Sequence, residues 1–528
     1  MIKNNTFLTL FICLNFCFST AQDRYERNDS ADIEHYRFSL FLNDTTNAIK
    51  GEAEITVNFK QGVEPFALDL IGKGETYGME ITKISEGSIK ANYNFSDHKI
   101  KITPLNQGGT TRSYTIHYEG IPERGLVIDT TKFGQRSFFG DNWPNLARHW
   151  LPSVDHPYDK ASVEFKVTAP AHYDVVATGK KIEESALGNG YKLTTYSESA
   201  PVAMKGMTIG VTHFATKLLG YSGTIPVTAW VYPENRLDGF SDYAVAVDIL
   251  NYFVDNIGPY AYEKLANMQA KTQWGGLENA GTISYFENSV NGKNQVEGLI
   301  AHEIAHQWFG NSATENSWNH VWLSEGFATY FAILYQEQRY GNDKRKEELR
   351  LDRKQIHSYY DTNPSPIVDN TIIDPLKVLS PNTYQKGGWV LNMLRHRLGD
   401  ETFWKGIRAY YKTYENANAL TQDFRAVMET VSGENLEDFF QQWLFTKGYP
   451  EISWKWSYRK GKITVSIQQK QSHALFHFPL EIGITQGGKT EIKKIQINSK
   501  QQSFEFSASQ KPDSLELDPE VWLLFQEK

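Results

Sequence analysis

The stretch His302-Glu303-Ile304-Ala305-His306, followed by Glu325 after eighteen intervening residues, decides how this chain of 528 residues is interpreted. In an α-helix, residues i and i+4 lie one turn apart on the same face, so His302 and His306 can bind one ion together. Zinc accepts imidazole nitrogen and carboxylate oxygen, and a catalytic zinc site leaves one position open. We therefore predict that His302, His306 and Glu325 hold one Zn²⁺ per chain. Glu303, rotated by about 100° around the helix, borders the metal and is the predicted general base.

The residues on either side of these ligands favour helices. Residues 296–308 carry apolar side chains at helical spacing, and Gly310 and Asn311 are residue types that end helices. Residues 322–331 open a second helix with an apolar face, which carries Glu325 on a rigid element. A lone H-E-x-x-H can also arise by chance on an amphipathic helix, but the spacing and the helical context together favour a metal site.

Further motifs follow in an order that resembles a known family. Gly275-Gly276-Leu277-Glu278-Asn279 resembles the G-x-M-E-N motif of the aminopeptidase N family of zinc metallopeptidases, gluzincins related to leukotriene hydrolase. Tyr384-Gln385-Lys386-Gly387 resembles the family's Y-x-K-G segment, and Trp443 followed by Gly448-Tyr449-Pro450 resembles the end of its catalytic domain. The likeness spans residues 270–450 and is looser over residues 36–216.

This resemblance assigns roles to further side chains. It implies that Tyr384 faces the reacting carbonyl group and stabilises the oxyanion that develops there. It also implies that Glu278 binds the α-amine of the substrate, which is at least partly cationic near neutral pH. The remaining substrate-binding residues would be Gly275, Gly276, Leu277 and Asn279. Without the resemblance, the Gly-Gly and Glu-Asn pairs would equally fit a surface turn.

The chain departs from the family pattern at two points. Leu277 replaces the usual methionine, which is a change of similar volume. The family often adds a glutamine or glutamate from its β domain to the amine site, and here Asp141 or Asn142 is the candidate for that position.

Taken together, these residues predict a zinc aminopeptidase that acts on peptides with a free N-terminus. A zinc endopeptidase is the alternative enzyme, because the metal site alone does not demand a free amine. Glu278 favours cleavage at the N-terminus. A catalytically silent peptide-binding module is the alternative from another class, and the intact Glu303 and Tyr384 argue against it.

The first 21 residues resemble a secretory signal. Lys3 supplies a positive charge, residues 7–18 are mostly apolar, and Ser19-Thr20-Ala21 offers small residues for cleavage. A membrane anchor is the alternative, but the run is short and interrupted by Asn15. A lipoprotein is disfavoured because Leu14-Asn15-Phe16 places no small residue before the cysteine that follows.

Export determines what the mature chain contains. The only two cysteines lie at positions 13 and 17, so the mature chain would have no disulfide. We expect a periplasmic or secreted protein without a transmembrane anchor once the signal is removed. The net charge of −8 and the absence of a Lys/Arg-rich run argue against nucleic acid as a partner.

Periodicity divides the rest of the chain into a multidomain α+β fold. Alternating apolar residues from Tyr36 onward predict an N-terminal antiparallel β domain over residues 22–216, which the resemblance implies to be saddle-shaped. Helical periods and a strand-like piece over residues 265–271 predict an α+β catalytic domain over residues 217–447, which with its zinc helix resembles a thermolysin-like domain. Alternation returns in residues 448–528, which predict a small β-sandwich with Trp454 and Trp456 in its core rather than forming a sugar platform. We expect a short form without the family's large C-terminal helical domain.

Overall fold

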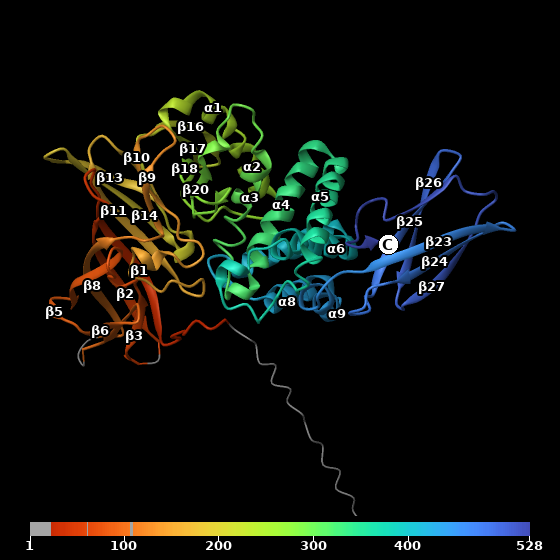
Figure 1. The fold of residues 1–528 in the computed structure, drawn as a ribbon, viewed down its shortest axis with the longest axis horizontal. Helices are drawn as coiled ribbons and strands as arrows, with labels where there is room; N and C mark the ends of the chain where they lie inside the picture. The colour runs from red at the N-terminus through yellow and green to blue at the C-terminus, as the bar shows by residue number, and fades with distance from the viewer. Residues whose placement is uncertain (1–22, 61, 106–108) are drawn as a thin grey trace, which may run out of the picture.

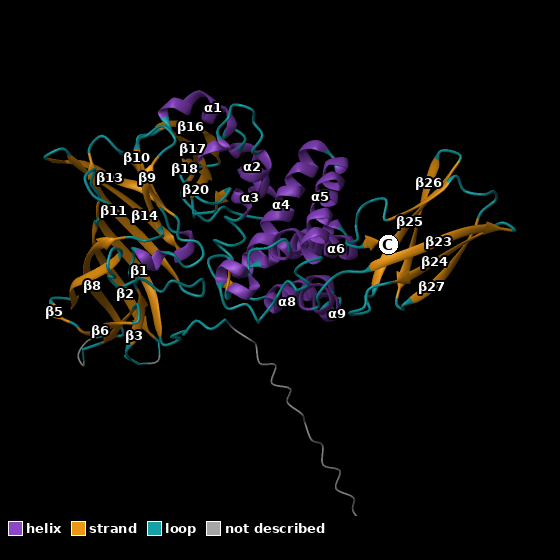
Figure 2. Ribbon diagram, in the orientation of Figure 1, coloured by secondary structure: helices purple, strands orange, loops and turns teal. Residues whose placement is uncertain are grey.

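The computed structural model describes residues 23–60, 62–105 and 109–528, so the predicted signal peptide, residues 1–21, lies outside the described part. Along the long axis in Figure 1, β-rich N-terminal sheets, a mixed middle part and C-terminal strands follow one another. Figure 2 shows strands concentrated at both ends and most helices between them. None of the described helices is both long enough and apolar enough to cross a membrane.

An eight-stranded sheet forms the largest layer of the N-terminal part. Buried side chains alternate along it, with Tyr36, Phe38 and Leu40 facing the core as their spacing predicts. Only β1 and β11 pair in parallel; the other neighbours are antiparallel. In sheet order the strands are β13 (Lys180–Gly188), β14 (Tyr191–Ala203), β11 (Lys160–Pro170), β1 (Ala31–Phe41), β2 (Ile49–Phe59), β8 (Thr111–Ile121), β4 (Gly78–Glu86) and β5 (Ile89–Lys90).

Two smaller sheets complete the N-terminal part, and one apolar core joins all three sheets. The four-stranded sheet contains β12 (Asp174–Ala177), β15 (Ile209–Thr212), β10 (Arg136–Gly140) and β9 (Leu126–Thr130). The three-stranded sheet contains β3 (Phe66–Asp69), β7 (Lys99–Thr103) and β6 (Asn92–Ser96). A short 3₁₀ turn, η2 (Met204–Gly206), follows β14, and its Gly206 carbonyl accepts a hydrogen bond from Ala280 of the middle part at 2.8 Å.

The middle part combines a five-stranded sheet with helices. Its strands in order are β16 (Ala215–Ser222), β17 (Ile225–Val231), β18 (Leu265–Ala270), β20 (Thr282–Phe286) and β19 (Gly276–Leu277). Its helices are α1 (Arg236–Asp242), α2 (Ala246–Asn256), α3 (Glu297–Ala305), α4 (Trp322–Tyr340), α5 (Asn342–Tyr360), α6 (Gly387–Leu398), α7 (Asp400–Tyr414), α8 (Thr421–Ser432) and α9 (Glu437–Phe440). The short strands β21 (Thr314–Glu315) and β22 (Asn418–Ala419) pair in parallel between them.

Two more sheets form the C-terminal part. One contains β27 (Gln501–Ser507), β24 (Lys462–Gln469), β23 (Glu451–Arg459) and β29 (Gln526–Glu527), and the other contains β26 (Lys489–Ile497), β25 (Phe478–Gln486) and β28 (Ser514–Leu517). Both contribute to an apolar core that continues into the helices of the middle part. Trp454 and Trp456 are partly buried against this core. The sandwich packing and the saddle shape stay predictions, as do the three domain ranges.

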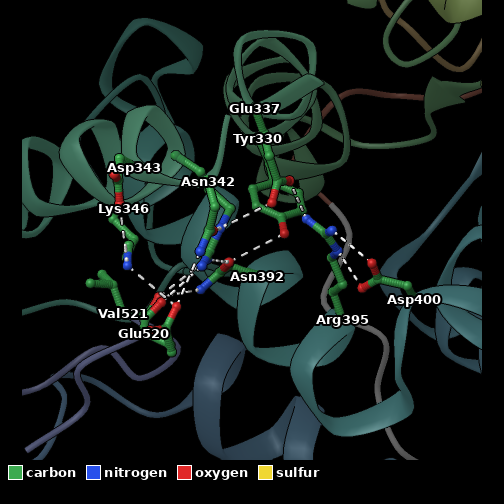
Figure 3. A network of polar contacts seen from close by, with 11 residues as sticks. Tyr330, Glu337, Asn342, Asp343, Lys346, Asn392, Arg395, Asp400, Glu520 and Val521 are labelled. Carbon is green, nitrogen blue, oxygen red and sulfur yellow. Dashed lines mark hydrogen bonds and ion pairs between the residues drawn. The ribbon is translucent and has the colours of Figure 1, made fainter. Parts of the chain in front are cut away.

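Polar contacts hold the C-terminal segment against the helices (Figure 3). Arg345 on α5 is fully buried and donates to the carbonyl of Glu520 at 2.8 Å. Asn392 on α6 donates to the carbonyl of Val521 at 3.2 Å, and Lys346 lies 3.3 Å from the Glu520 carboxylate. Because a buried guanidinium needs partners for its donors, these contacts fix the end of the chain on α5 and α6.

The predicted cut between residues 216 and 217 falls inside an element. Strand β16 begins at Ala215 and pairs with β17 of the middle sheet, so the chain already enters that sheet two residues before the cut. The predicted helix over residues 296–308 is shorter in the structure, where α3 ends at Ala305 and His306 follows with helical dihedral angles.

Candidate active site

Three ligand atoms meet at one point between α3 and α4. The Nε2 atoms of His302 and His306 lie 3.1 Å apart, and Glu325 Oε2 lies 3.5 Å from the first and 3.2 Å from the second. Ligands about 2.0–2.1 Å from a tetrahedral zinc ion are separated by about 3.3 Å, so this triangle has the size that the ion requires. Glu325 Oε2 is buried and accepts no hydrogen bond within the described chain. The donor set and this free oxygen therefore fit a divalent metal such as zinc.

A second layer of contacts orients His306. Its Nδ1 atom lies 3.1 Å from the Phe309 carbonyl and 3.0 Å from the Ser324 hydroxyl. Because a carbonyl only accepts hydrogen bonds, Nδ1 carries the hydrogen and the Nε2 lone pair points to the other ligands. Burial lowers the pKa of His306, but the charge of Glu325 outweighs burial and raises it to about 9, so a bound metal ion would displace the Nε2 proton.

The carboxylate of Glu303 points to Gly276 in the short strand β19, which borders the site. A side chain on Gly276 would place its Cβ only 2.3 Å from Glu303 Oε1, so the glycine at this position makes room for the carboxylate. Gly275 has no comparable neighbour, since its nearest contact would be Leu299 at 3.8 Å. Burial raises the pKa of Glu303 well above its ordinary value, and a cation at the three ligands would act in the opposite direction.

Tyr384 lies beside the metal ligands, just before the point where α6 contacts α4. It belongs to the π-helical turn η7 (Asn382–Lys386), and its ring stacks on that of His302 with centroids 5.9 Å apart. Burial, followed by the charge of Glu325, raises the pKa of Tyr384 well above its ordinary value, so the phenol stays protonated and can donate. Just after η7, Gly387 meets Gly326 of α4, where an added Cβ on Gly326 would lie 2.9 Å from the Gly387 backbone.

One cavity of about 390 Å³ connects these groups. It is lined by the three metal ligands, by Glu303 and Tyr384, and by Glu278 from the segment after β18. Its far side reaches the α4 and α5 side chains of Gln336, Glu348 and Asp352. Most of the predicted site residues therefore line one cavity, although they come from segments up to about a hundred residues apart.

The segment Gly275–Asn279 divides between the cavity and the interior. Gly275, Gly276 and Glu278 line the cavity. Leu277 instead packs in an apolar cluster with Trp143 and Trp318, and Asn279 donates to Ser284 at 3.2 Å. Neighbouring residues of an extended strand point to opposite sides, so Leu277 and Glu278 face different surroundings. The structure thus places Leu277 and Asn279 outside the cavity lining.

Two charged residues beside Glu278 were not predicted from the sequence. Lys205 Nζ lies 2.7 Å from Glu315 Oε1 and 3.8 Å from Glu278 Oε1. Lys205 belongs to η2 of the N-terminal part, and Glu315 belongs to β21. No local pattern distinguishes either residue from the chain's other charged residues, since only the fold brings them together.

The two candidates for a further amine-site residue have different surroundings. Asn142 is fully buried, donates to the carbonyls of Met204 and Met207 at 3.3 and 2.7 Å, and accepts from Trp150 at 2.8 Å. Its side chain is thus used to hold η2 in place. Asp141 instead lies 3.2 Å from Nε1 of Trp274, which lines the cavity. Burial raises the pKa of Asp141 to about 6.

Comparison with protein families identifies the fold. The Peptidase M1 N-terminal domain matches residues 32–203, and the Peptidase family M1 domain matches residues 242–443. Together the two matches cover more than two thirds of the chain. The chain therefore belongs to peptidase family M1, which confirms the resemblance found in its motifs.

The relatives with similar sequences are named as aminopeptidases. Human glutamyl aminopeptidase (Homo sapiens) is 27% identical over 331 residues, which cover 59% of this chain and 34% of that protein. Aminopeptidase M1 of Arabidopsis thaliana is 31% identical over 333 residues, with 59% and 37% covered. Probable aminopeptidase 2 of Sulfurisphaera tokodaii is 27% identical over 403 residues, with 72% and 50% covered. The aligned part thus spans between a third and a half of each relative.

Solved structures share the architecture. An M1 zinc metallopeptidase from Deinococcus radiodurans superposes with a TM-score of 0.67 at 23% identity, covering 80% of this chain and 95% of that one. A mutant of that enzyme bound to a Tyr-Ser-Ala substrate gives a TM-score of 0.66 at 22% identity, with 80% and 96% covered. The predicted order of a β-rich N-terminal domain and a catalytic domain of helices and strands is confirmed.

Proposed function

We propose that this protein is a zinc-dependent aminopeptidase that hydrolyses the N-terminal peptide bond of peptides. The observation that carries the proposal is that a three-ligand metal site and the free carboxylate oxygen of Glu278 line the same cavity. A substrate whose first carbonyl group lies at the metal would then present its α-amine to Glu278. The names of the M1 relatives support this activity.

The chain's own groups divide the chemistry among them. Zinc held by His302, His306 and Glu325 would supply a Lewis acid that polarises the carbonyl and acidifies water. Glu303 accepts the proton from the attacking water and returns it to the leaving amine. Tyr384 donates a hydrogen bond to the developing oxyanion.

Glu278 separates this function from its alternatives. A buried carboxylate binds a cationic amine strongly because little water competes with the contact. An N-blocked peptide offers no such charge, so Glu278 favours cleavage at the first bond over cleavage within a chain. A silent peptide-binding module would have no use for Glu303 and Tyr384, which both line the cavity.

We further propose that the enzyme works outside the cytoplasm. The basic Lys3, the apolar run over residues 7–18 and the small residues before Gln22 support export. Mass spectrometry of protein from the periplasm or medium tests this point, because export with cleavage yields a chain that begins at residue 22.

An assay with aminoacyl 4-nitroanilides tests the activity. We expect release of nitroaniline from free-amine substrates, no release from their N-acetyl forms, loss of turnover with 1,10-phenanthroline and recovery with zinc. Cleavage of N-blocked internal bonds would instead indicate an endopeptidase. Peptide binding without any turnover would indicate a silent module.

A further inference from the structure

A buried lysine lies between two buried carboxylates at the amine end of the cavity, which is the end where Glu278 would bind the substrate α-amine. The side chains of Lys205, Glu278 and Glu315 are 2%, 7% and 0% exposed, so water solvates none of them well. Burying an unpaired charge costs several kcal/mol, so Lys205 and Glu315, which are the two most buried groups, compensate each other. Glu278 lines the cavity and keeps the remaining negative charge.

The lysine is not shared equally between the two acids. Its Nζ forms a hydrogen bond with Glu315 Oε1 at 2.7 Å but lies 3.8 Å from Glu278 Oε1, beyond hydrogen-bonding distance. Glu278 Oε1 is buried and accepts no hydrogen bond within the described residues. Glu278 thus has a positive charge nearby and still keeps an oxygen free for another donor.

The charges of the cluster leave room for one cation. Two carboxylates and one ammonium sum to a single negative charge, which one substrate α-ammonium would neutralise. Lys160 is the next cation, but its Nζ contacts the carbonyls of Asn311 and Ser312, and no carboxylate lies within ion-pairing distance of it in the described chain. Burial lowers the pKa of Lys160 to about 7, so it contributes only part of a charge near neutral pH.

The fold holds Lys205 where it is from several sides. Asn142 fixes the η2 turn through the carbonyls of Met204 and Met207, and Ala280 donates to the Gly206 carbonyl at 2.8 Å. The ring of Trp318 lies 5.8 Å from Lys205 Nζ. The lysine comes from the N-terminal domain, so the meeting of two domains sets its distance to Glu278.

We propose that Lys205 and Glu315 position Glu278 for the substrate amine and thereby set the enzyme's affinity for a free N-terminus. Glu315 holds the ammonium of Lys205 back from the free oxygen of Glu278. Without Glu315, Lys205 would pair with Glu278 and compete with the substrate for that oxygen. Lys205 and Glu315 are positioning residues, and the proposal rests on the proposed aminopeptidase function.

Two variants test this charge balance with a free-amine aminoacyl 4-nitroanilide. We expect Glu315→Met to raise KM by about 10-fold or more while kcat changes by less than about threefold, because a buried charge pair is rearranged and the metal site is not. In the double variant Lys205→Met/Glu315→Met, the cluster keeps the one net negative charge that it has in wild type, now carried by Glu278 alone. KM should then return to within about threefold of wild type, which is a strongly non-additive result.

Control variants distinguish the positioning role of Lys205 and Glu315 from a general loss of structure. Lys346 and Glu520 form another interdomain ion pair, 3.3 Å apart and away from the cavity, so Lys346→Met/Glu520→Met should leave KM unchanged. An unchanged KM in Glu315→Met, or a double variant that is worse than Glu315→Met, would overturn the proposal. Absence of turnover in the wild-type enzyme would contradict the proposed function instead, so the two failures are distinguishable.

Discussion

The metal end and the amine end of the cavity are built in different ways. At the metal end, every ligand atom comes from the single run of residues 302–325, on α3, on the residue that follows it and on α4. At the amine end, Glu278 meets Lys205 from the N-terminal domain and Glu315 from β21. Helix spacing and the packing of two neighbouring helices assemble the first end, whereas the second exists only when two domains are in contact. Variants at the two ends should therefore affect different kinetic constants.

The largest effect is expected at the metal end. Glu303→Gln removes the group that accepts the proton, so kcat should fall by about 1000-fold while bound zinc, measured by elemental analysis, stays near one per chain. Glu297→Gln is the matched control, because Glu297 also lies on α3 but pairs with Arg339 at 3.0 Å and does not line the cavity. Near-normal turnover of Glu303→Gln would refute the assignment of the base.

Tyr384→Phe should act next, also at the metal end. Loss of one donor to a developing oxyanion lowers kcat by about 100- to 1000-fold, and KM should change little because the contact forms in the transition state. Steady-state kinetics with one free-amine substrate measures both constants. A raised KM with unchanged kcat would instead make Tyr384 a binding residue.

Glu278→Gln should reverse this pattern at the amine end. We expect KM for free-amine substrates to rise by about 30-fold or more, since one partner of a buried charge contact is lost. Inhibition by an amino acid amide should weaken, whereas any binding of its N-acetyl form should stay as weak as in wild type. Equal effects on both inhibitors would remove the amine-anchoring role.

Asp69→Asn tests how much a buried group of charges stabilises the N-terminal domain, away from both ends of the cavity. Asp69 is buried and contacts Lys99 at 2.6 Å and Arg148 at 3.6 Å. Burial raises its pKa, but Arg148 and Lys99 outweigh burial and hold the pKa below its ordinary value. The variant should lose about 3 kcal/mol of unfolding free energy at pH 7.

The pH dependence of that loss follows from the direction of the shift. A carboxyl whose pKa is lowered by folding adds stability above its unfolded pKa of about 4, and this stability disappears as the pH falls through the folded pKa. Denaturant titrations of wild type and Asp69→Asn should therefore converge below about pH 4. A constant difference down to pH 2 would contradict the ionic role.

Asn142→Ala should give the smallest effect. It leaves the carbonyls of Met204 and Met207 without this donor, which costs about 1–2 kcal/mol of stability. Because η2 carries Lys205, KM should rise a few-fold while zinc content stays unchanged. A loss of zinc in this variant would show that the two ends are coupled more tightly than their construction suggests.

The same contrast explains how much could be predicted from the sequence. Spacing on a helix was enough to bring His302 and His306 to one point, and alternation placed Tyr36, Phe38 and Leu40 in a β-sheet core. Tyr384 required a family resemblance, because its position next to His302 depends on η7 folding against α4.

Other features had no local signal. Lys205 lies 110 residues before Glu315, and nothing in the pattern around either residue predicts their contact. Asn142 and Asp141 were equivalent candidates in sequence, yet one bonds to backbone carbonyls and the other to Trp274. Long-range contacts of this kind arise from domain packing, which periodicity does not encode.

The backbone contact between Gly326 and Gly387 has a consequence for the metal end. Gly326 on α4 directly follows the ligand Glu325, and Gly387, the first residue of α6, comes three residues after Tyr384. Helices α4 and α6 are therefore in contact next to the backbone that carries the carboxylate and the phenol. A single methyl group at either glycine would act as a spacer that drives the two anchors apart. The distance between the Tyr384 phenol and a reacting carbonyl therefore depends on the absence of a side chain at both glycines. A substitution at either one would change turnover without altering any atom that contacts the substrate.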